Sequence, residues 1–265
     1  MTYISIPTFT MLRQTRTIAF YTLLEALRNR LAWLVLITLF AGIGISGFLN
    51  ELALTESRQV QVALLAAFLR FAAVFLLATF VVTSMVRESN DKGLELLLAL
   101  PLPRAGYLLG KLAGFATLAL VPALLFGSLL LMLTPWTQAV LWTASLIAEC
   151  WIIAAFSLLC VLTFNQIMAA LSSVIAFYLL ARSIGALELI EATAVGSQTL
   201  AQQAIKLLVD GLSAVLPHLD NFTRTEWLVY HTGNLAALWP LLAQTSIYLC
   251  LLAGAAMFDL YRKNI

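Results

Sequence analysis

The stretch Arg87–Lys111, RESNDKGLELLLALPLPRAGYLLGK, follows a long apolar run and is the most polar interruption in the first half of the chain. Asn90 can cap a helix that begins at Asp91. This helix is expected to end at Ala99, ahead of Pro101, because a residue that precedes proline avoids the α-helical region. A helix of this length is too short to span a bilayer. We therefore expect an amphipathic helix at the membrane surface, exposed to the cytoplasm.

Composition places the rest of the chain in the membrane. Of its 265 residues, 62% are hydrophobic and 11% are charged. Soluble domains carry about 25% charged residues, so a water-soluble globular protein is excluded. The three cysteines, Cys150, Cys160 and Cys250, lie in apolar runs, which is typical of small core residues and not of a disulfide framework or metal cluster. The composition predicts an all-α integral membrane protein.

Six apolar runs approach or exceed the roughly 20 residues that a membrane-spanning helix needs. They cover residues 31–48, 62–86, 112–133, 139–164, 167–182 and 236–258. The fifth run is expected to continue past Arg182, whose long side chain can reach the outer interface. Residues 184–235 leave this pattern and show helical periodicity between Gln198 and Val215. We expect one membrane domain, 1–265, with residues 184–235 as an external helical segment.

Residues 11–30 differ from the spans because arginines alternate with apolar residues. This mixture predicts an interfacial amphipathic helix that lies in the headgroup layer. The alternative is a plain basic extension of the first span.

Basic residues set the expected orientation, since they gather on the cytoplasmic side of membrane proteins. With a cytoplasmic N-terminus, ten of the fifteen lie on that side. They are Arg13, Arg16, Arg28, Arg30, Arg87, Lys92, Arg104, Lys111, Arg262 and Lys263. The external side receives Arg58, Arg182, Lys206 and Arg224, and Arg70 lies within a span. Both termini and residues 87–104 are therefore expected in the cytoplasm.

Arg70 and Glu149 are the ionisable residues that lie deepest in the spans. A charge at the bilayer centre costs about 2.5–3.5 kcal/mol on insertion scales, so each needs a partner or a cavity. At about 1.5 Å per residue, Arg70 lies some 12 Å and Glu149 some 15 Å below the outer ends of their spans. The two can therefore pair between helices. Such a pair is either structural or part of the polar lining of a conduit.

Two other patterns suggest chemistry only weakly. Gly106-Tyr-Leu-Leu-Gly110-Lys111 is one residue short of a phosphate-binding loop and lacks its hydroxyl residue, so no ATP site is expected in this chain. His218 and His231 lie near carboxylates, but no tight ligand spacing accompanies them. We expect surface or interface packing for both histidines, with metal binding as the alternative.

Arg87-Glu88, Lys92-Gly93-Leu94-Glu95-Leu96-Leu97-Leu98, Pro101-Leu102-Pro103-Arg104 and Gly110-Lys111 together resemble the signature of ABC-2 type transporter permeases. That signature reads Arg-Glu-x-x-x-Gly-Thr-x-Glu-x-Leu-Leu, followed by a proline, a basic residue and Gly-Lys. Lys92 and Gly93 depart from it, because they stand where glycine and threonine are usual. The external Leu-Pro-x-Leu-Asp-x-Phe pattern, residues 216–222, is also similar to permeases of the copper/sulfur-processing exporters that serve nitrous oxide reductase maturation.

The resemblance implies a permease subunit in the cytoplasmic membrane that exports a substrate as a homodimer. Two separate ATPase subunits would bind the ATP and magnesium, while this chain would hold no cofactor or metal and would not be an enzyme. Its ATPase-coupling residues would be Arg87, Glu88, Asp91, Lys92, Gly93, Glu95, Leu98, Pro101 and Arg104. Membrane lipid is a further partner, an external accessory protein is left open, and no nucleic acid is implied.

Two other classes of function stay open. One is a membrane scaffold or assembly factor that engages an ATPase without moving a solute. The other is a secondary transporter, which the absence of repeated halves disfavours. Few polar residues line the spans, which fits a lipid-like, a peptide or a small-solute cargo about equally.

Overall fold

The computed structural model describes residues 8–28, 30–52, 57–90, 104–193 and 200–262. Within these ranges all regular secondary structure is helical, and six helices are long and apolar enough to cross a membrane, which confirms the predicted fold class. The spanning helices are α2 (Leu31–Leu52), α3 (Ser57–Asn90), α5 (Arg104–Leu131), α6 (Trp136–Phe164), α7 (Ile167–Thr193) and α10 (Leu238–Arg262). The remaining elements are α1 (Thr8–Arg28), α8 (Leu200–Val215), η1 (Leu219–Asn221), α9 (Thr225–Tyr230) and η2 (Leu235–Ala237).

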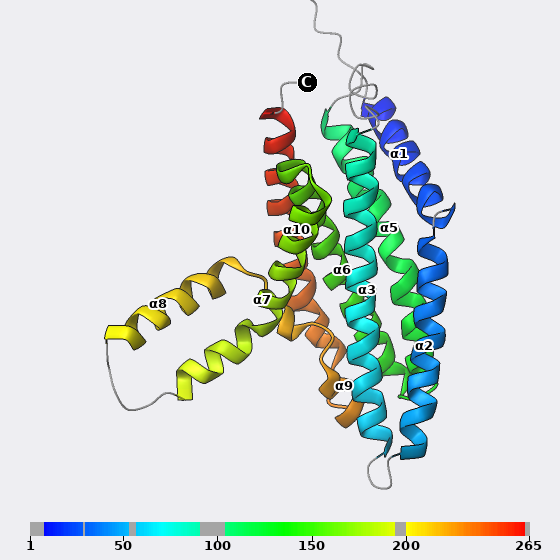
Figure 1. Ribbon diagram of the computed structural model, residues 1–265, viewed down its shortest axis with the longest axis vertical. Coiled ribbons are helices and arrows are strands. Elements are labelled where there is room, and N and C mark those ends of the chain that lie inside the picture. Colours follow the sequence, from blue (N-terminus) through cyan, green and yellow to red (C-terminus); the bar gives the residue numbers. More distant parts are fainter. Residues whose placement is uncertain (1–7, 29, 53–56, 91–103, 194–199, 263–265) are drawn as a thin grey trace, which may run out of the picture.

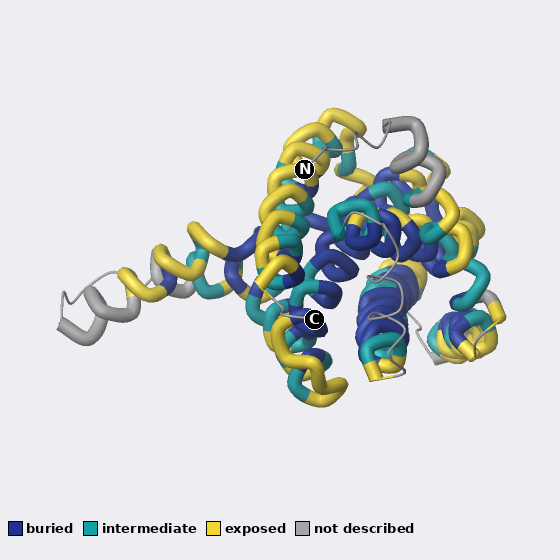
Figure 2. The backbone as a smooth tube through the Cα atoms, turned by 90° about the horizontal axis from the view of Figure 1, so that it is seen from above, coloured by how far each residue is buried: buried dark blue, intermediate teal, exposed yellow. Residues whose placement is uncertain are grey.

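Helix α6 is the centre of the bundle and packs against α3, α5, α7 and α10 (Figure 1). Viewed along the bundle, its surroundings are buried, while the outer sides of the peripheral helices are exposed (Figure 2). Pro135 precedes its first turn, and Asn165 ends it in the left-handed region at φ 53°. Both residues suit these positions. Proline is tolerated at the start of a helix, and asparagine adopts the left-handed conformation more readily than most residues.

Helix α3 is the longest element and runs without a break through 34 residues. At 1.5 Å per residue this corresponds to about 50 Å, more than the roughly 30 Å of a bilayer core. The helix is therefore longer than the hydrocarbon core is thick. The end at Asn90 lies at the same end of the bundle as the start of α1 and the end of α10 (Figure 1).

Helix α1 packs lengthwise along the first turns of α5, and two glycines make the close approach possible (Figure 1). A Cβ at Gly110 would lie 2.9 Å from the Cβ of Ile18, and one at Gly114 would lie 2.7 Å from the Cβ of Thr22. Small residues four apart let two helices approach closely in membrane proteins. Gly110 does not belong to a phosphate-binding loop. It allows α1 and α5 to pack closely.

The fifth span is longer than its sequence suggests. Residues 184–193, expected at the start of the external segment, continue helix α7, which then projects away from the bundle together with α8 (Figure 1). Ser213 of α8 donates a hydrogen bond to Glu188 of α7, and the Tyr248 hydroxyl donates to the Val215 carbonyl over 3.1 Å. These bonds connect α8 to α7 and α10. The helical periodicity expected from Gln198 corresponds to α8.

The glycine contact between α1 and α5 can be tested with matched alanine substitutions. Gly114→Ala is expected to lower the midpoint of thermal unfolding in detergent, because the new methyl group would overlap Thr22. The control is Gly44→Ala in α2, where an added Cβ has no neighbour within 4 Å. Alanine favours a helix by roughly 0.8–1 kcal/mol over glycine, so the control should be neutral or stabilising. Equal shifts in both variants would contradict the close contact.

Candidate functional site

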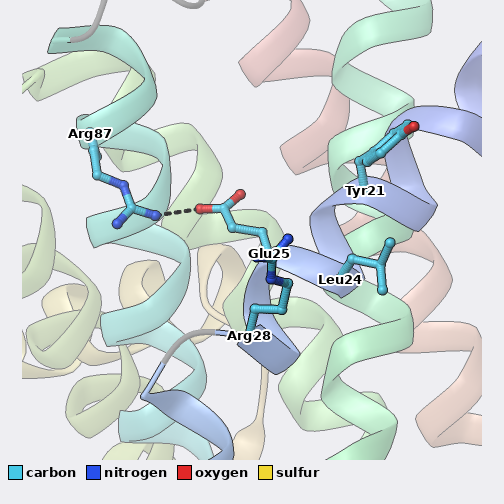
Figure 3. Close-up of a pocket in the computed structure, with 5 residues that line it drawn as sticks. All are labelled: Tyr21, Leu24, Glu25, Arg28 and Arg87. Atoms are coloured by element: carbon cyan, nitrogen blue, oxygen red, sulfur yellow. Dashed lines mark hydrogen bonds and ion pairs between the residues drawn. The ribbon is translucent and has the colours of Figure 1, made fainter.

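Two groups of polar residues are candidates for function, one at the Asn90 end of α3 and one beside Arg70, in the first half of the helix. The first surrounds Asn90, from which the chain enters residues 91–103. Arg87 forms an ion pair with Glu25 of α1 at 2.6 Å (Figure 3). Ser84 donates to the same Glu25 oxygen over 2.9 Å. Glu88 forms an ion pair with Lys111 of α5 at 2.5 Å. The last turns of α3 are therefore connected to α1 and α5.

Arg104 holds the other end of the same segment. Its Nη1 donates to the Leu260 carbonyl over 3.1 Å, and its guanidinium lies 5.8 Å from the centre of the Tyr261 ring. The beginning of α5 is thus attached to the last turn of α10. The predicted coupling residues between these ends, Asp91, Lys92, Gly93, Glu95, Leu98 and Pro101, lie outside the described residues.

The second group is a buried network centred on Thr223, which lies in the short connection between η1 and α9. Its partners include Arg70 and Arg182. Thr223 is fully buried. Its backbone N–H donates to the Ser145 hydroxyl over 2.8 Å, and its own hydroxyl donates to Glu149 Oε2 over 2.8 Å. Its carbonyl accepts a bond from Arg70 Nη1 over 3.2 Å. The N–H, the carbonyl and the hydroxyl of Thr223 therefore all form hydrogen bonds, two with α6 and one with α3.

Arg182 of α7 completes this Thr223 network. Its Nη1 donates to the carbonyls of Leu219 and Phe222 over 2.5 and 2.9 Å and to the Thr223 hydroxyl over 3.3 Å. The same nitrogen lies 3.7 Å from Glu149 Oε1. The sequence suggested that the Arg182 side chain reaches the membrane interface. Instead it points into the bundle and binds residues 219–223. The reason is that α7 continues beyond it, which places it inside the spanning helix.

The predicted pair of Arg70 and Glu149 takes a different form. Both side chains reach Thr223, but within 4 Å the ion-pair partner of Glu149 among the described residues is Arg182. Glu149 is completely buried, so a nearby cation offsets the cost of removing its charge from water. Thr223 thus lies between Arg70 and Glu149, which the sequence suggested would form a direct pair.

Thr223 also has an uncommon backbone conformation, with φ at 43°. A β-branched residue in the left-handed region is strained, at a cost on the order of 1–3 kcal/mol. Its surroundings compensate for this, since every polar group of the residue has a partner. Next to it, Asp220 lies against Gly185 of α7, where an added Cβ would be 2.4 Å from the carboxylate. A side chain at position 185 would therefore require the Asp220 carboxylate to move.

The two histidines occupy different places. His218 contacts Ser213 at 3.2 Å and Glu188 at 3.4 Å. His231 follows α9 and lines a cavity of about 630 Å³ together with Arg58 and other residues. In the described part of the chain no group of three or more histidine, cysteine or acidic side chains is placed to hold a metal ion.

Sequence reasoning missed three members of the Thr223 network, namely Ser145, Arg182 and Thr223 itself. Ser145 carried a detectable signal, because it precedes Glu149 by four residues and such residues share one face of a helix. Thr223 carried none, since nothing in its local sequence indicates burial between α3, α6 and α7.

The chain matches the model of a known protein family. The model of a family described as ABC-2 family transporter protein matches residues 45–208. This range includes α3, α5, α6 and α7, the residues from Arg87 to Arg104, and the Arg70, Ser145, Glu149 and Arg182 side chains of the Thr223 network. Among curated proteins no match is found.

The ion pair in the Thr223 network can be tested by a double-mutant cycle. Glu149→Leu or Arg182→Leu alone is expected to cost about 3–5 kcal/mol of unfolding free energy, because each leaves one buried charge without its partner. The double variant should lose clearly less than the sum of the two. Unfolding in mixed detergent micelles gives the free energies, with Glu226→Leu as a control at an exposed acid. Additive losses would contradict the pairing.

Proposed function

Because the chain belongs to the ABC-2 family of transporter membrane proteins, we propose that it is the permease subunit of an ATP-driven exporter in the cytoplasmic membrane. The chain supplies the membrane component, and ATP with its magnesium ion binds to a separate ATPase. Two copies of this chain and two ATPase subunits form the transporter. The single observation that carries the proposal is the family match across four spans and the segment between α3 and α5.

The proposed contact with the ATPase is residues 87–104. Support comes from the residues that flank it, since Arg87, Glu88 and Arg104 connect both ends of this segment to α1, α5 and α10. A displacement of the segment would therefore move helices and not only a loop. The remaining predicted coupling residues, Asp91 to Pro101, belong to the same proposed contact.

Helix α3 is the proposed path of that displacement through the membrane. It carries Arg87 and Glu88 at one end and Arg70 at the level of Thr223, with no break between them. Rigid helices with discrete packings are the usual carriers of such coupling. Movement at Asn90 would reach the Thr223 network and, through it, the external residues 219–230. This gives the ATPase an effect on the far side of the membrane.

The proposed orientation places both termini and residues 87–104 in the cytoplasm. It rests on the ten basic residues that this arrangement assigns to the cytoplasmic side. The start of α1 and the end of α10 share one end of the bundle with Asn90 and Arg104, which agrees with this arrangement (Figure 1). Residues 219–230 then face the external side, where an accessory protein would have access.

The ATPase contact is tested by breaking the proposed coupling helix. Leu96→Pro, or Glu88→Ala combined with Glu95→Ala, is expected to leave the protein inserted in the membrane but to reduce co-purification of the ATPase by about tenfold. Proline inside a helix costs roughly 3 kcal/mol, enough for a loss of this size. Glu226→Ala, on the proposed external side, is the control and should retain the ATPase.

Activity measurements separate transport from a scaffold role. In lipid, the intact complex should hydrolyse ATP faster when its substrate is present, whereas a scaffold would show no such stimulation. Normal coupled ATP hydrolysis by the Leu96→Pro variant would overturn the assignment of residues 87–104. Purification of the chain without any ATPase would favour a secondary transporter.

A further inference from the structure

A cavity of about 460 Å³ lies between α1 and α3 and is lined by Tyr21, Leu24, Glu25, Arg28 and Arg87 (Figure 3). We propose that it binds the headgroup of an anionic phospholipid whose phosphate carries a hydroxylated alcohol, such as phosphatidylglycerol. The volume lies within the range of about 300–1,000 Å³ that is usual for small-molecule sites. The inference is independent of the transport function, because it needs only this chain and a membrane.

The charges in the cavity favour an anion. Two guanidinium groups face one carboxylate, so the lining has a formal surplus of one positive charge. Glu25 Oε1 is already occupied by Arg87 at 2.6 Å and by Ser84 at 2.9 Å. Arg28 makes no hydrogen bond or ion pair within the described part of the chain. A planar guanidinium with free N–H groups is well suited to bind phosphate oxygens in pairs.

Glu25 adds selectivity within this chemistry. Its second oxygen, Oε2, has no protein partner among the described residues, so it can accept a hydrogen bond from a ligand. A headgroup that carries hydroxyl groups beside its phosphate would satisfy Arg28 and Glu25 together. Glycerol attached to phosphate has this combination, and its single negative charge balances the surplus of the cavity.

The position of the cavity favours a lipid over a free anion. Arg28 ends α1, and the spanning helix α2 begins three residues later at Leu31. On α2 the side chains of Trp33, Ile37 and Phe40 are 71%, 58% and 68% exposed, as expected for a helix side that contacts acyl chains. The cavity therefore lies where headgroups meet hydrocarbon, and Leu24 gives it an apolar wall. Basic sites at this level bind anionic headgroups in other membrane proteins.

The test compares lipid retention by the purified full-length chain and two variants. The protein is extracted from nanodiscs that contain equal amounts of dioleoylphosphatidylglycerol and dioleoylphosphatidylcholine, and bound lipids are counted by native mass spectrometry. Wild type should retain phosphatidylglycerol preferentially. Arg28→Gln should reduce this retention about tenfold, the usual effect of one charge-assisted bond. Arg16→Gln, which removes the same charge from an exposed site on α1 outside the cavity, should retain it like wild type.

The outcomes separate this site from its rivals. Retention that is equal for both lipids, or equally reduced by both substitutions, would overturn the proposal in favour of general attraction to a basic surface. Displacement of the bound lipid by 10 mM inorganic phosphate would assign the site to a soluble anion and also overturn it. Unchanged retention of phosphatidylglycerol in Arg28→Gln would also overturn the proposal, because the guanidinium would then not hold the headgroup. Selective loss in Arg28→Gln, resistant to phosphate, supports the lipid site.

Discussion

The Thr223 network satisfies the constraint that backbone polar groups inside a membrane domain need partners from the protein. Residues 219–224 pass between α3, α6 and α7 without forming a spanning helix. Backbone outside a spanning helix is tolerated within a membrane domain only where it is buried in protein or lines a water-filled cavity. Arg182 binds two of its carbonyls, Arg70 binds a third, and Ser145 accepts the N–H of Thr223. Glu149 offsets the charge that the arginines bring. Without these side chains the segment would have to leave the bundle.

At the Asn90 end of α3, packing matters more than ion pairs. The side chains of Arg87 and Glu25 are 56% and 33% exposed, and such pairs contribute only about 0–1 kcal/mol. The pair of Lys111 and Glu88 is more buried, at 7% and 16%, and is the firmer of the two. Close contact of α1 with Gly110 and Gly114 of α5 gives an attachment that does not depend on salt. The ion pairs then fix the position of α3 against a unit already formed by α1 and α5.

The sequence predicted the spans well because length and apolarity determine them almost alone. The Thr223 network was predictable only in part. Arg70 and Glu149 were detectable because they are charged residues well inside long apolar runs. Arg182 was placed wrongly because it ends an apolar run of 15 residues, whereas α7 continues through Ile184 and Leu187 to Thr193. Its partners Leu219 and Phe222 lie about 40 residues further on, beyond the reach of any periodicity.

The strain at Thr223 indicates what the network requires. Glycine would adopt φ 43° at little cost, yet it would lose the hydroxyl that donates to Glu149 and accepts from Arg182. A serine would retain the hydroxyl but not the methyl group that fills this fully buried position. Threonine is thus the residue whose groups hold α6 and α7 together while its carbonyl holds α3. A segment attached to three spanning helices at one strained residue cannot move independently of them. It will follow any rearrangement of α3, and it therefore links the position of α3 to that of α6 and α7.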